Sequence, residues 1–127
     1  MVGSIGPGLC VLVGVTHTDD RTAAARLAEK VWRLRIFEDE QGRVNRSAEE
    51  LGLEVLVVSQ FTLYADTSRG RRPSFVEAAG PEHAEPLVEA VVASLCELGA
   101  MVTTGRFGAT MSLALVNEGP FTLLVEV

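Results

Sequence analysis

A short apolar segment near the N-terminus places the strongest limit on how this chain folds. Residues 9–15 (LCVLVGV) are apolar throughout and rich in valine. Side chains of a strand point alternately to its two faces, so such a run predicts a strand that is covered on both faces. It is far shorter than the ~20 residues that a helix needs to cross a bilayer. We therefore expect a sheet strand in a packed core, and no membrane-spanning segment.

The composition predicts one folded domain over residues 1–127. A chain of 127 residues with 47% hydrophobic and 22% charged residues can bury a core of its own. Residues 1–7 lack the basic and apolar regions of a secretory signal, and only two cysteines are present, so a reducing, cytoplasmic location is expected. Cys10 and Cys96 lie in apolar stretches and are predicted to be buried.

Two main helices are predicted. Apolar residues recur at helical spacing from Thr18, which can cap the helix, to about Arg35. A second apolar stripe ends at Gly99. Its helix begins at Pro81 or Pro86, both of which suit a first helical position, and we expect the later start.

Apolar runs bounded by turn residues predict the remaining strands. They cover residues 36–38, 43–45, 53–63, 100–104, 111–116 and 121–127. Residues 47–50 (SAEE) match a capped helical turn. Strands and helices intermix without strict alternation, which favours the α+β class. We therefore predict a mixed, antiparallel or barrel-like sheet with two main helices.

The charge pattern and the titratable residues exclude several kinds of site. A net charge of −6 argues against a protein that coats nucleic acid through bulk charge, and no glycine-rich phosphate loop follows a strand. His17 and His83 belong to no metal-ligand spacing and are expected to be ordinary surface histidines. Paired carboxylates at residues 38–40 and 49–50 lie in or beside turns. We therefore predict no metal and no cofactor.

Residues 59–63 (SQFTL) depart from this plain pattern. Polar side chains end an apolar strand here, and strand alternation predicts that Gln60, Thr62 and Tyr64 share one face. An amide beside a hydroxyl group offers donors and acceptors for an ester or for the edge of a nucleobase. A strand that emerges into solvent explains the same residues about as well.

Residues 117–122 (NEGPFT) are the second unusual stretch. Gly119 lacks a Cβ and lets a ligand approach the backbone, and the bond before Pro120 can be cis. A plain hairpin turn is the simpler interpretation of these residues.

Four segments, taken in order, resemble the D-aminoacyl-tRNA deacylase family. They are residues 59–63 (SQFTL), 70–75 (GRRPSF), 104–107 (TGRF) and 117–122 (NEGPFT). The resemblance extends from about Gly3 to the C-terminus, and the first and last segments together are specific at this spacing. It implies the deacylase fold, a homodimer and tRNA as the partner.

The resemblance also implies an activity, which is hydrolysis of the ester that joins a D-amino acid, or glycine mischarged on the alanine tRNA, to the 3′ end of tRNA. In the family, a Gly–cis-Pro pair from one subunit enters the pocket of the other subunit. Its carbonyl groups crowd the side on which an L side chain points, while glycine passes. Here the pair is Gly119–Pro120.

The residues implied in the pocket are Ser59, Gln60, Phe61, Thr62 and Phe75. Arg69, Arg71 and Arg72 could meet tRNA phosphates, and a solvated loop explains them equally well.

Thr62 is the obvious nucleophile by residue type. However, no His, Lys or carboxylate in its motif would activate the hydroxyl group. The 2′-OH of the terminal ribose is the better candidate to position water, with backbone N–H groups stabilising the oxyanion. We therefore expect Thr62 to line the pocket beside Ser59, Gln60 and Phe61 rather than to attack the ester.

Members of this family usually carry a further β-strand and turn before the stretch that matches Gly3. This sequence begins at Met1, shortly before Gly3, so we expect a short N-terminus, an uncovered sheet edge or barrel seam, and lower stability than in a form extended upstream. A deacylase-like module that binds a nucleotide or a partner without turnover is the alternative function.

Overall fold

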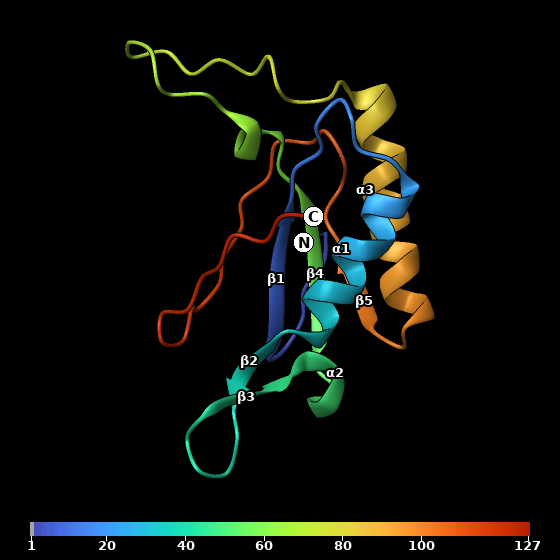
Figure 1. Cartoon of the computed structure of the whole chain (residues 1–127), viewed down its shortest axis with the longest axis vertical. Helices are drawn as coiled ribbons and strands as arrows, with labels where there is room; N and C mark the ends of the chain where they lie inside the picture. Colours follow the sequence, from blue (N-terminus) through green and yellow to red (C-terminus); the bar gives the residue numbers. More distant parts are fainter. Residues whose placement is uncertain (1) are drawn as a thin grey trace.

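A three-stranded parallel sheet forms the centre of the structure, a computed structural model that describes residues 2–127. Its strands are β1 (Gly8–Val13), β4 (Glu54–Ser59) and β5 (Met101–Thr104). β4 lies in the middle and runs parallel to both neighbours, with Val13 opposite Ser59 at the upper end of β1. β1 and β4 end side by side, so the residues that follow them meet at the C-terminal end of the sheet (Figure 1).

Two helices pack against each other and cover one face of this sheet (Figure 1). They are α1 (Arg21–Arg33) and α3 (Pro81–Glu97). Burial of the apolar stripes of both helices against the inward side chains of the strands removes the most apolar surface from water. The most deeply buried residues of this core include Val13, Ala28, Trp32, Val55, Val57 and Leu95.

An antiparallel hairpin and a capped helical turn complete the regular structure, as the sequence predicts. The hairpin consists of β2 (Arg35–Glu38) and β3 (Val44–Ser47), and α2 (Ala48–Leu51) follows directly. Ser47 and Glu50 form a reciprocal capping box. The α+β class and the two main helices are therefore confirmed. Among the named strands of residues 2–127, β2 and β3 of the hairpin pair antiparallel, while the central sheet is parallel.

Both main helices begin at positions that differ from the predicted ones. Asp20, not Thr18, caps α1, because its carboxylate accepts a hydrogen bond from the N–H of Ala23 at 2.9 Å. α3 begins at Pro81, and the later start at Pro86 was wrong. Pro86 lies inside the helix, where a proline removes one backbone hydrogen bond, and the buried apolar stripe keeps the helix continuous.

Three predicted strands differ from the structure. The strand expected over residues 53–63 ends at Ser59, and η1 (Phe61–Tyr64), a 3₁₀ helix, replaces its second half. Residues 111–116 and 121–127 form no strand. They build an extended arm that returns to the body only near the C-terminus (Figure 1). A β-strand needs a partner for its backbone, and no strand within residues 2–127 pairs with this arm.

The second face of the sheet is largely open, which corrects two expectations. Val13 is only 3% exposed, whereas Leu12, on the opposite face, is 39% exposed. β1 is thus covered on one face rather than two, because both helices lie on the same side. Cys10 shares the open face and is exposed, and Cys96 is also exposed, so the predicted burial of both cysteines was wrong.

The prediction of no secretory signal concerns residues 1–7, of which Met1 lies outside the described residues. Within residues 2–127, no helix is both long enough and apolar enough to cross a membrane.

Candidate functional site

The polar motif that follows β4 forms a tight turn at the C-terminal end of this central strand. The N–H of Gln60 donates to the carbonyl of Val13 at 2.8 Å, which extends the pairing of β4 with β1 by one residue. The carbonyl of Gln60 then accepts from the N–H of Leu63 at 3.2 Å, which begins η1. The change from strand to 3₁₀ helix turns Phe61 and Thr62 outward, and both are exposed.

Gln60 and Thr62 are close together, but not because of strand alternation. The amide Nε2 of Gln60 donates to the hydroxyl Oγ1 of Thr62 at 2.5 Å. The turn of η1 brings these side chains together, so the predicted strand face shared with Tyr64 was wrong in its geometry. An amide cannot accept a proton from a hydroxyl group at neutral pH, so this contact orients Thr62 without activating it.

Gly14 is a residue of this site that the sequence interpretation missed. A Cβ atom at position 14 would lie 3.0 Å from the Cβ of Leu63 and 3.3 Å from the carbonyl oxygen of Gln60. Glycine therefore lets η1 pack directly against the chain that leaves β1. The only signal in the sequence was a glycine that interrupts a run of valines.

Two phenylalanines form the aromatic part of the site. The rings of Phe61 and Phe75 meet edge to face, with centroids 5.1 Å apart and planes at 65°. Phe75 belongs to a long connection between η1 and α3, which we call the strap (residues 66–79). The strap is the upper extended loop in Figure 1. The structure thus brings together two residues, 14 positions apart, that the family resemblance implies in the pocket.

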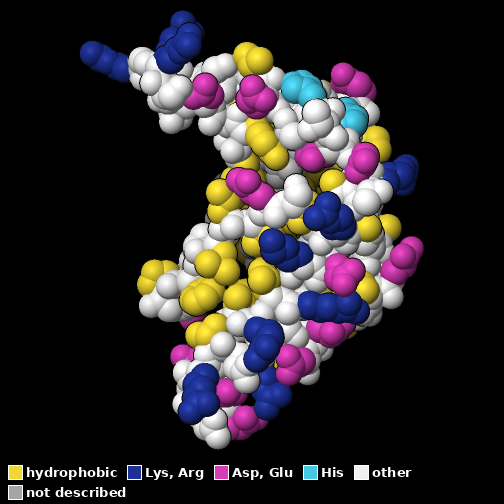
Figure 2. Space-filling model, viewed as in Figure 1, with side chains coloured by type: hydrophobic (Ala, Val, Ile, Leu, Met, Phe, Trp, Pro, Cys, Tyr) yellow, Lys and Arg dark blue, Asp and Glu magenta, His cyan; other side chains and the backbone are white. Residues whose placement is uncertain are grey.

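The three arginines lie near the far end of the strap. Arg69, Arg71 and Arg72 are all exposed. In Figure 2, Lys or Arg side chains lie at the outer end of the uppermost projection of the molecule. Within residues 2–127 no carboxylate forms an ion pair with any of these three arginines. At the base of the strap, hydrogen bonds from Ser68 hold the pKa of Asp66 below its usual range.

Residues 117–122 form an ordered turn at the tip of the arm. Asn117 holds the turn closed, since its Oδ1 accepts from the N–H of Phe121 at 2.9 Å and its Nδ2 donates to Oγ1 of Thr122 at 2.8 Å. Gly119 has φ of +127°, a conformation that favours glycine, and the bond to Pro120 is cis, as expected. Figure 1 shows the arm's tip well away from η1. Within one chain, therefore, the two motifs do not meet.

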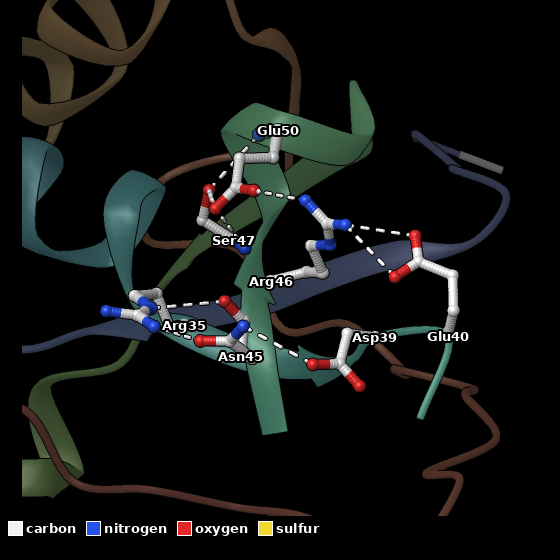
Figure 3. Close-up of polar contacts among 7 residues, drawn as sticks. All are labelled: Arg35, Asp39, Glu40, Asn45, Arg46, Ser47 and Glu50. Carbon is white, nitrogen blue, oxygen red and sulfur yellow. Dashed lines mark hydrogen bonds and ion pairs between the residues drawn. The ribbon is translucent and has the colours of Figure 1, made fainter. Parts of the chain in front are cut away.

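The remaining charged residues gather elsewhere. Arg46 donates to both Glu40 and Glu50, with the shortest contacts at 2.9 and 3.1 Å, and so links the hairpin to α2 (Figure 3). Backbone N–H groups of Arg43 and Gln41 lower the pKa of Asp39. These groups form a solvated network that fixes the hairpin. Among residues 2–127 no three His, Cys, Asp or Glu side chains are arranged to hold a metal ion.

A cavity of about 200 Å³ lies beside the site rather than in it. It opens between the start of α1 and the last residues of the chain, and Gly14, Tyr64 and Val127 are among its lining residues. Burial, and to a smaller extent Asp19 and Glu126, raise the pKa of Tyr64. None of Ser59, Gln60, Phe61 or Thr62 lines this cavity.

Fold and site together define a small α+β protein. Its exposed site of hydroxyl, amide and aromatic groups lies at the C-terminal end of the central strand. The family model for D-Tyr-tRNA(Tyr) deacylase matches residues 1–126. The chain belongs to the D-Tyr-tRNA(Tyr) deacylase family.

The chain is also similar to individual proteins and solved structures. A D-aminoacyl-tRNA deacylase of Halalkalibacterium halodurans is 56% identical over 125 residues, which cover 98% of this chain and 86% of the relative. A solved structure titled c-Myc DNA Unwinding Element Binding Protein matches with a TM-score of 0.87 and 34% identity, over 94% of this chain and 81% of that chain. A structure titled as a probable eukaryotic D-amino acid tRNA deacylase shares the fold, with a TM-score of 0.70 and 16% identity over 84% of this chain and 77% of the other.

Proposed function

We propose that this chain hydrolyses the ester bond of D-aminoacyl-tRNA and releases the free D-amino acid and tRNA. The observation that carries the proposal is the match to the deacylase family over residues 1–126, together with the 56% identical deacylase that this chain covers almost completely. The proposed substrate is the 3′ acceptor end of tRNA, and the proposed place of action is the cytoplasm.

The proposed pocket is built on the end of β4. Ser59, Gln60 and Thr62 supply polar groups for the terminal adenosine and the ester, and the Phe61–Phe75 pair supplies an apolar wall. Water attacks the ester carbonyl, the bond to the ribose oxygen breaks, and the ribose oxygen takes up a proton. The hydroxyl of Thr62 is held by an amide rather than by a base, which favours a role for the neighbouring 2′-OH in placing the water. Backbone N–H groups around the pocket would stabilise the oxyanion.

The proposed selectivity needs a second copy of the chain. Gly119 and Pro120 lie at the tip of the arm, remote from their own η1 (Figure 1). In a homodimer the tip of one chain would reach the pocket of the other, and its carbonyl groups would crowd the position of an L side chain. D-Amino acids and glycine would pass, so glycine mischarged on the alanine tRNA would be a second substrate.

The surface of the arm supports this assembly. Many of its large apolar side chains are exposed in the single chain, among them Val116 at 87% and Leu124 at 77%. Figure 2 shows hydrophobic side chains gathered around the arm, below a hollow that the strap overhangs. An exposed apolar region of this kind is typical of a subunit interface.

The arginines of the strap are proposed contacts for tRNA phosphates. Arg69, Arg71 and Arg72 project from a chain whose net charge is −6, so binding would depend on local rather than overall charge. The enzyme then needs to hold only the acceptor end of its substrate.

The direct test is release of labelled tyrosine from D-tyrosyl-tRNA, with L-tyrosyl-tRNA as the matched control. We expect rapid release from the D ester and slow release from the L ester. A chain that binds either tRNA without releasing amino acid would instead be a non-catalytic binding module, and the proposed function would be wrong.

A further inference from the structure

We propose that Thr16 and His17 are positioning residues that fix the strap so that Phe75 stays against Phe61. Neither residue touches the proposed pocket. This inference rests on the proposed function for its effect on catalysis, but its structural part stands on hydrogen bonds alone.

Both side chains bind backbone carbonyl groups of the strap. The Oγ1 of Thr16 donates to the carbonyl of Glu77 at 2.5 Å, and Nε2 of His17 lies 2.6 Å from the carbonyl oxygen of Val76. A carbonyl group only accepts, so Nε2 of His17 must carry the proton in this contact. The two carbonyl groups belong to Val76 and Glu77, the two residues that directly follow Phe75.

Backbone hydrogen bonds extend the same contact. The N–H of Ala79 donates to the carbonyl of Val15 at 2.9 Å, and Thr16 pairs with Ala78 in an isolated antiparallel bridge. On the other side of Phe75, Ser74 and Asp66 exchange backbone hydrogen bonds of 2.7 and 2.8 Å. Phe75 thus lies between two anchors, and Thr16 and His17 supply the side-chain part of the second.

The base of this second anchor is itself fixed. Asp19 accepts a hydrogen bond from the N–H of Thr16 through Oδ2 at 2.9 Å, which closes the turn after β1. The carbonyl of Asp19 accepts from Nε2 of His83, in the first turns of α3, at 2.8 Å. The two histidines therefore tie one turn to the strap and to α3.

Apolar packing alone does not hold the strap here. Phe75 is 39% exposed and Val76 is 75% exposed, so these two residues bury little apolar surface, and the strap enters the core only at Ala79. Segments with few buried contacts open at low free-energy cost unless hydrogen bonds retain them. Loss of the His17 contact should therefore make the backbone after Phe75 more mobile. The Phe75 ring, which forms one wall of the proposed pocket, would then be held less firmly.

The test compares His17→Leu, which cannot donate, with His17→Gln, whose amide donates at a similar reach. A hydrogen bond contributes about 0.5–1.5 kcal/mol, or roughly 2- to 10-fold in an equilibrium. We expect His17→Leu to raise KM for D-tyrosyl-tRNA by about this factor with kcat nearly unchanged, and His17→Gln to restore KM. Thr16→Val and Thr16→Ser form a second matched pair. Equal KM values for His17→Leu and the unsubstituted chain would overturn the role in catalysis.

Amide hydrogen exchange provides a readout that does not depend on activity. We expect faster exchange at residues 75–79 in His17→Leu, and protection close to the original in His17→Gln, while the core strand β4 exchanges as before. Unchanged exchange at residues 75–79 would overturn the proposal. If the unsubstituted chain shows no deacylation, the proposed function fails, and the exchange data still decide whether Thr16 and His17 hold the strap.

Discussion

Single residues at the site act mainly by orienting one another. The hydroxyl of Thr62 is fixed by the amide of Gln60, and the two polar ends of Asn117 close the turn that carries Gly119. Neither contact transfers a proton, so each contributes geometry rather than acid or base. We expect chemistry at such a site to rely on a precisely held substrate and water, because residues 59–63 contain no His, Lys or carboxylate to act as a base.

Replacement of Thr62 by alanine tests this view. We expect Thr62→Ala to retain most of the turnover, because its hydroxyl has no activating base. A substrate with a 2′-deoxy terminal ribose should react far more slowly; loss of one oxyanion-hole donor costs about 10²–10³ in rate, which sets the scale for a lost catalytic group. Single-turnover rates on both substrates measure the difference. Loss of turnover in Thr62→Ala, with normal hydrolysis of the 2′-deoxy ester, would show that Thr62 attacks directly.

Asn117 offers a second test at the same scale. Asn117→Leu removes both hydrogen bonds that close the turn, whereas Asn117→Asp keeps the acceptor for Phe121. We expect the ratio of D to L hydrolysis to fall by up to about 30-fold in Asn117→Leu, which loses two bonds of about 1 kcal/mol each, and by less in Asn117→Asp. An unchanged ratio in both variants would separate this turn from selectivity.

Among the helices and strands, the sequence predicted correctly those that are determined by side chains within a few residues of one another. The capping box at Ser47 and Glu50 and the hairpin before it follow from side chains within a few residues. The start of α3 was misplaced because Pro86 carries a strong local signal that tertiary packing overrides. Residues 111–116 have the composition of a strand, but strand formation depends on a distant partner that composition does not reveal.

The same limit applies to the site. The motif at residues 59–62 and its aromatic partner Phe75 were predicted from the sequence through the family resemblance. The roles of Gly14 and His17 were not, because each depends on a backbone segment that is far away in the chain. Residue type alone gave no sign of either contact.

The hairpin allows a prediction about pH. Hydrogen bonds from Arg46 and from the Ser47 backbone hold the pKa of Glu50 below its ordinary value, and the pKa of Glu40 is also lowered, by a backbone hydrogen bond and then by Arg46. The folded hairpin therefore binds fewer protons than the unfolded chain near these pKa values. Its stabilising effect is present above about pH 4.5 and is lost as the pH falls through the lowered values.

Arg46→Gln should make the acid dependence of stability shallower. We expect the melting temperature of this variant to fall less between pH 6 and pH 3 than that of the unsubstituted chain. Arg69→Gln is the control, since it removes an arginine outside any ion pair within residues 2–127. Parallel pH curves for Arg46→Gln and the unsubstituted chain would contradict the assigned role of the network.

At the scale of the whole molecule, one face of the sheet is packed and the other is open. The helices bury the inward side chains of the strands, while Leu12 and the arm present apolar surface to solvent. We therefore expect a homodimer with about twice the 13.6 kDa mass of one chain. Leu124→Glu should shift sedimentation toward the monomer and weaken deacylation at low concentration. Full activity of a species that sediments as a monomer would contradict the shared site.

In the proposed mechanism, the enzyme selects its substrates by excluding L side chains rather than by binding D side chains. Hydrolysis rates for D-alanyl, glycyl and L-alanyl esters on one tRNA distinguish exclusion of L side chains from binding of D side chains. We expect similar rates for the D-alanyl and glycyl esters, and a rate at least about 100-fold lower for the L-alanyl ester, equivalent to about 2.7 kcal/mol of barrier. A glycyl ester that reacts as slowly as the L-alanyl ester, or equal rates for all three, would contradict it.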